Sequence, residues 1–64
     1  MTRKEWVALC AAYYAKHGHV ADDVADEMAE AFADMHQASL GVDATSWPNP
    51  QDAARDDIAG WTDD

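Results

Sequence analysis

Hydrophobic and polar positions alternate with the period of an α-helix in three separate segments of this chain. In the first, the larger apolar residues fall within an arc of about 160°, opposite an alanine-rich side. That arc comprises Trp6, Val7, Leu9, Cys10, Tyr13, Tyr14 and His17. Thr2 and Glu5 have the spacing of a capping box, and Gly18 suits the left-handed residue that ends a helix. We predict a helix over residues 3–17.

The clearest amphipathic pattern covers residues 21–39, with Gly41 near its end. Its apolar side comprises Ala21, Val24, Ala25, Met28, Phe32 and Met35. Six carboxylates fall within an arc of about 140° on the other side. We therefore predict a second, longer helix that places Met28, Phe32 and Met35 in the core.

Proline and glycine divide the remainder of the chain. Residues 41–49 read as a loop, because Pro48 and Pro50 cannot continue a helix. Asn49 can cap a third helix with Pro50 at its first position, over residues 50–59. Residues 62–64 form an acidic tail. The sequence predicts an all-α fold, a small three-helix domain with a long acidic amphipathic middle helix. Trp47 and Trp61 either fold over the ends of this bundle or stay exposed as interface anchors.

Length and cysteine content limit the possibilities further. The chain has 64 residues, enough for a single domain. Cys10 is the only cysteine, so no internal disulfide can form, and a reducing cytoplasm is the expected compartment. We identify no signal peptide, and the longest apolar run, Val7 to Ala15, is too short to span a bilayer.

Charge is distributed very unevenly along the chain. Residues 1–20 carry a net charge of +2, whereas residues 21–64 carry −11. Such an acidic surface disfavours direct binding to nucleic acid or to anionic lipid, and it favours a basic partner.

The candidate partner-binding residues are the carboxylates of the second and third helices. They are Asp22, Asp23, Asp26, Glu27, Glu30 and Asp34, with Asp52, Asp56 and Asp57 as a second row. The first six span roughly 18 Å at 1.5 Å per residue, about one charge per 3.6 Å. A B-DNA strand carries one phosphate per about 3.4 Å of axis. An acidic helix face can also be merely a solvated surface, but no Lys or Arg interrupts this one, although alternating charges would stabilise the helix.

Other chemistry finds less support in the sequence. His17, His19, Asp22 and Asp23 are conceivable metal ligands, but they complete no metal-site pattern, and a histidine partly buried near the helix end is the simpler interpretation of His17. Cys10 lies among aromatic residues, which indicates a buried, inert thiol. We predict no cofactor, no bound metal and no enzymatic activity.

The segment from His17 to Met35 combines His-Gly-His-Val-Ala-Asp-Asp with Asp26, Glu27, Glu30 and Asp34. In size, charge and helix pattern the chain resembles small phage-encoded DNA-mimic inhibitors, most of all anti-CRISPR proteins against type I surveillance complexes, with type I-C the suggested target. The resemblance implies a protein of the host bacterial cytoplasm that blocks DNA binding by a basic, PAM-recognising subunit. The positively charged first helix departs from a uniformly acidic mimic and is expected to be scaffold.

Two other functions stay open at this point. A small helical interaction module, such as an antitoxin or a dimeric adaptor, would bind through its apolar or alanine-rich surfaces. A small metal-binding regulator would use the histidines. The sequence fixes neither the oligomeric state nor the partner.

Overall fold

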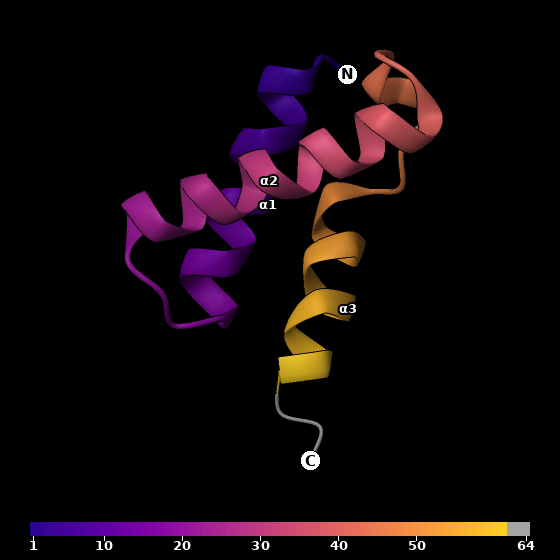
Figure 1. The fold of residues 1–64 in the computed structure, drawn as a ribbon. Coiled ribbons are helices and arrows are strands. Elements are labelled where there is room, and N and C mark those ends of the chain that lie inside the picture. Colours follow the sequence, from indigo (N-terminus) through magenta and orange to yellow (C-terminus); the bar gives the residue numbers. More distant parts are fainter. Residues whose placement is uncertain (62–64) are drawn as a thin grey trace.

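A computed structural model describes residues 1–61, and the predicted acidic tail at 62–64 lies outside the described residues. The described chain forms three α-helices and one short 3₁₀ turn, without strands, which confirms the all-α fold (Figure 1). The elements are α1 (Arg3–His17), α2 (Asp22–Leu40), η1 (Ala44–Ser46) and α3 (Pro50–Trp61). Their bounds agree with the predicted helices to within two residues, and η1 lies inside the predicted loop. No helix in residues 1–61 has both the length and the apolarity to cross a membrane.

The predicted caps at the starts of α1 and α3 are present. The Glu5 amide donates to the Thr2 hydroxyl, and the Thr2 amide donates to the Glu5 carboxylate, both at 3.2 Å. The Asn49 side-chain oxygen accepts from the amides of Gln51 and Asp52 at 2.9 and 3.2 Å. These bonds satisfy amides that lack a partner within the helix, which explains where α1 and α3 begin.

The predicted left-handed Gly18 is wrong. Gly18 has φ −89° and ψ −9°, and the positive φ of 57° belongs to His19. Gly18 is required by space instead, because an added Cβ would lie 2.7 Å from the Tyr14 carbonyl oxygen and 3.0 Å from the Trp61 ring. That ring stacks on Tyr14 with centroids 5.6 Å apart, so α3 closes over the end of α1.

The core is built around α1, which packs against both α2 and α3. Trp6 is fully buried, and its indole N–H donates to the Pro48 carbonyl at 2.8 Å. Trp47 meets it edge-on with centroids 5.3 Å apart and donates to the Gly41 carbonyl at 3.0 Å. Trp47 is therefore a core residue that anchors the 41–49 segment, whereas Trp61 stays 42% exposed.

The predicted core side of α2 is wrong in part. Its fully buried residues are Ala25, Ala29 and Ala33, of which only the first was predicted. Met35 is 56% exposed, and Met28 and Phe32 are only half-buried. At 100° per residue, α2 is rotated by about 90° from the predicted orientation. Small side chains at every fourth position let α2 approach the bulky side chains of α1.

The buried side of α1 also differs from the predicted arc. Its buried residues are Trp6, Val7, Cys10, Ala11 and Tyr14. Leu9 is 38% exposed, and Ala11 of the alanine-rich side is buried in the core. The interpretation of His17 as partly buried is wrong: it is exposed, with its ring 4.3 Å from that of Tyr13.

Candidate partner-binding surface

The six carboxylates of α2 are all exposed. We call them the acidic row: Asp22, Asp23, Asp26, Glu27, Glu30 and Asp34. Asp22 and Asp26 border a hollow that is otherwise lined by alanines of α1 and α2. The other four fall within an arc of about 60° of the helix circumference, which gives them a shared outward direction.

Arg3 reaches the acidic row from the start of α1. Its guanidinium donates to Asp34 at 2.7 Å, to Glu30 at 3.2 Å and to the Gln37 side-chain oxygen at 2.7 Å. The C-terminal half of the row is thus partly neutralised by a residue of the same chain. Glu30 and Asp34 keep side-chain exposures of 57% and 71%, so they remain open to a partner.

The N-terminal half of the acidic row has no such neutralisation. Within residues 1–61, Asp22, Asp23, Asp26 and Glu27 form no ion pair. Ala21 at the N-cap of α2 makes no side-chain hydrogen bond. Asp22 and Asp23 in the first turn interact favourably with the positive end of the helix dipole, which stabilises this uncapped end.

The three aspartates of α3 do not form a uniform second row. Asp52 and Asp56 are exposed and lie about 40° apart around the helix. Asp52 lies 3.8 Å from Arg55, an exposed pair that contributes little to stability. Asp57 is exposed as well, but its carboxylate is directed to α1, where it accepts the Tyr14 hydroxyl at 2.7 Å.

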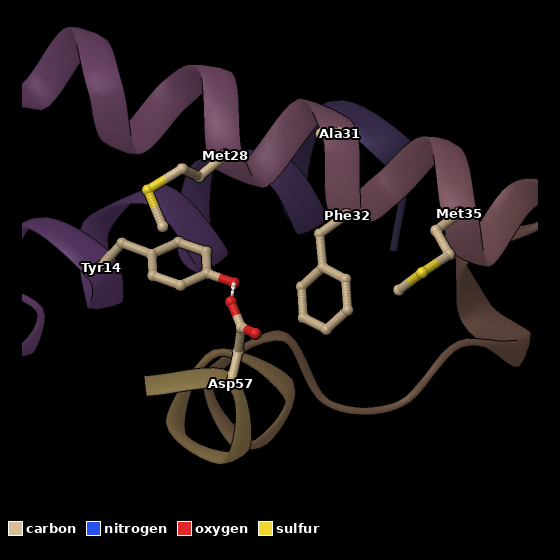
Figure 2. Close-up of a pocket in the computed structure, with 6 residues that line it drawn as sticks. All are labelled: Tyr14, Met28, Ala31, Phe32, Met35 and Asp57. Carbon is tan, nitrogen blue, oxygen red and sulfur yellow. Dashed lines mark hydrogen bonds between the residues drawn. The ribbon is translucent and has the colours of Figure 1, made fainter. Parts of the chain in front are cut away.

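Asp57 lies at the edge of an apolar groove of about 290 Å³ between α2 and α3 (Figure 2). We call this hollow the α2/α3 groove; it is lined by Tyr14, Met28, Ala31, Phe32, Met35 and Asp57. Sequence reasoning missed it because it assigned the methionines and phenylalanine to the core. The sequence did contain a signal for the buried side of α2, namely alanine at positions 25, 29 and 33. These small side chains form a smoother surface for contact with α1 than Met28, Phe32 and Met35 do.

Tyr14, which lines this groove, and the buried Cys10 are both poor nucleophiles. Cys10 is fully buried, as predicted, and burial raises the pKa of its thiol to about 11. Burial also raises the pKa of Tyr14, and the bond to Asp57 raises it further. Both groups stay protonated at neutral pH, so neither supplies the anion that covalent catalysis requires.

The histidines are not assembled into a metal centre. Within residues 1–61, no three His, Cys, Asp or Glu side chains are grouped to hold an ion. His36 instead packs between Trp6 and Phe32, with ring centroids 5.1 and 4.6 Å away. Its Nδ1 donates to the Phe32 carbonyl at 2.8 Å, because a carbonyl can only accept.

Comparison of the chain with protein-family models, with curated proteins and with solved structures gave no match.

Proposed function

We propose that this protein is a non-enzymatic inhibitor whose acidic row occupies a basic, nucleic-acid-binding site on another protein. One observation carries the proposal. Four exposed carboxylates, Asp22, Asp23, Asp26 and Glu27, crowd into two turns of α2 without an ion pair in residues 1–61. Asp22 and Asp23 interact favourably with the positive end of the helix dipole, but four like charges this close repel one another. A small domain has little stability to lose, so their retention favours a use in binding.

The dimensions of the acidic row agree with this role. Its six charges span roughly 18 Å of helix, and Arg3 lowers the net charge of that length from −6 to −5. The spacing of about 3.6 Å stays close to the rise of about 3.4 Å per phosphate in one DNA strand. A helix holds these charges in fixed positions, which reduces the entropy lost on docking.

The resemblance to anti-CRISPR inhibitors supplies the partner to test first. In this proposal, the protein acts in the bacterial cytoplasm on the PAM-recognising subunit of a type I CRISPR surveillance complex, with type I-C tested before other subtypes. The inhibitor binds the basic residues that would otherwise hold duplex DNA.

The test is a gel-shift assay of target DNA with a purified type I-C complex, with and without this protein. The informative variant is Asp23→Asn with Glu27→Gln, which spares the contacts of Arg3. The matched control is Val42→Lys with Gln51→Lys, which changes the net charge equally at exposed positions outside the row. We expect the native protein and the control to block DNA binding at similar concentrations. The row variant should need a concentration about tenfold higher for the same inhibition.

Two results would contradict the proposal. Equal inhibition by the row variant and the control would show that net charge, and not the acidic row, is responsible. Absence of inhibition with every type I complex would remove the assigned partner. A salt-washed pull-down from bacterial lysate, followed by DNA competition for the retained proteins, would then decide whether another basic DNA-binding site is the target.

A helical interaction module, such as an antitoxin or a dimeric adaptor, is the second candidate. The exposed apolar side chains of α2 favour it, because Met35 in the α2/α3 groove and Leu40 beyond it are 56% and 48% exposed. Sedimentation at low and high salt separates the two functions: an apolar association survives high salt, whereas the complex of an acidic mimic weakens.

A further inference from the structure

The apolar side of α2 is left partly uncovered along about three turns, since Met35 and Leu40 are exposed and Met28 and Phe32 only half-buried. Next to the α2/α3 groove lies a second hollow of about 280 Å³, which shares Met35 and is also lined by His36, Ser39, Leu40 and Pro48. The two hollows together run from Met28 to Leu40, twelve residue steps or about 18 Å. Figure 2 shows Phe32 and Met35 projecting from α2 on the side where Asp57 of α3 lies.

We propose that these two hollows, which we together call the trough, bind a cationic amphipathic helix of a partner protein. The length matches about three turns of helix, and the lining offers apolar sites at the spacing that a helix presents through positions i, i+3 or i+4, and i+7. Met28 and Met35 are flexible and polarisable, so they adjust to the side chains that enter.

Charge complementarity selects a cationic helix. Asp57 is the charged residue among those that line the two hollows, and no Lys or Arg lines either of them. The chain as a whole carries −9. A second copy would bring the same −9 to the contact, and an anionic membrane would be repelled, whereas Lys or Arg beside an apolar stripe would be attracted by Asp57 and by the net negative charge of the chain.

This surface is separate from the acidic row. At 100° per residue, Met28, Phe32 and Met35 lie about 80–180° around the helix from Asp23, Glu27, Glu30 and Asp34, and only Ala31 of the groove lies nearer, about 40° from Glu27. The inference therefore does not depend on the proposed inhibition of DNA binding, and each can fail while the other holds.

The test uses a designed 14-residue peptide of Lys and Ala with Leu at positions 2, 5, 9 and 12. Methyl NMR follows the three methionines of the protein, of which Met28 and Met35 line the groove and Met1 lies beside Thr45. We expect the methyl signals of Met28 and Met35 to shift on titration, while that of Met1 stays unchanged as an internal control.

Two variants and a control locate the contact. Met35→Gln keeps helix propensity and removes an exposed apolar group, so it should weaken the peptide about tenfold. Leu9→Gln makes the same kind of change on α1, where Leu9 is 38% exposed outside the groove, and should leave affinity unchanged. Asp57→Asn retains an acceptor for Tyr14 and should weaken binding about threefold with a smaller salt dependence.

Peptide controls decide what drives the binding. A peptide with Glu in place of Lys should not bind. A peptide with the same composition but scattered Leu positions should leave the Met28 and Met35 methyls unshifted. Equal binding of the scattered peptide, or equal loss in Leu9→Gln and Met35→Gln, would overturn the proposal. So would methyl shifts that depend on protein concentration alone, because they would show that a second copy fills the groove.

Discussion

Substitutions at Ala29 and Met35 test how α2 packs on α1. We consider Ala29→Leu and Met35→Ala. The apolar pattern assigns Met35 to the core, and truncation of a buried methionine costs about 2–5 kcal/mol. The structure makes the opposite assignment, because Ala29 is fully buried and Met35 is 56% exposed.

The structure sets the size of each effect. About 44% of the Met35 surface is removed from water, and full burial is worth about 1.5–3 kcal/mol, so Met35→Ala should cost only about 0.7–1.3 kcal/mol. No closed cavity forms, because the groove is open. Ala29→Leu forces three extra carbon atoms into the contact with α1, which should cost about 1–3 kcal/mol or more. A domain of 64 residues has about 3–10 kcal/mol in total.

Urea unfolding followed by far-UV circular dichroism measures both free energies, and thermal melts provide a check. At about 4–8 °C per kcal/mol, Ala29→Leu should lower the melting temperature by roughly 4–24 °C, and Met35→Ala by roughly 3–10 °C. A larger loss for Met35→Ala than for Ala29→Leu would refute the alanine contact and restore the orientation expected from the apolar pattern.

Three further outcomes follow from individual contacts. Hydrogen bonds from Thr2 lower the pKa of Glu5 in the folded protein. The stability that the Glu5 carboxylate supplies is therefore complete above its unfolded pKa, about 4.5, and is lost as the pH falls through its folded pKa. In urea titrations, Glu5→Gln should lose less stability on acidification than the native protein does. Because Cys10 is buried with a pKa of about 11, a thiol reagent at neutral pH should label the folded protein at least about a hundredfold more slowly than the urea-unfolded chain, and equal rates would exclude this packing. Trp47→Phe removes the N–H donated to Gly41 and should cost about 1–2 kcal/mol in a thermal melt, whereas an unchanged melt would mean that this bond does not anchor the loop.

The candidate surface was only partly predictable from the sequence. The acidic row follows from helical period, since residues 22–34 carry six acids on one arc. Two features depended on contacts between residues distant in sequence. Arg3 pairs with Glu30 and Asp34, which are separated from it by 27 and 31 positions, and Tyr14 donates to Asp57 across 43 positions. No local pattern encodes such distances, because they arise only when the helices pack.

The sequence by itself determined the three helices, their caps at Thr2 and Asn49, and the acidic charge of α2, because these depend on neighbours within about four residues. Tertiary structure decided which side of each helix is buried. The larger apolar residues of α2 were expected inside, yet Trp6 and Tyr14 of α1 fill the core and leave room only for Ala25, Ala29 and Ala33. Close packing favours the combination of side chains that fits the space between two helices, so hydrophobicity along one helix cannot fix its orientation.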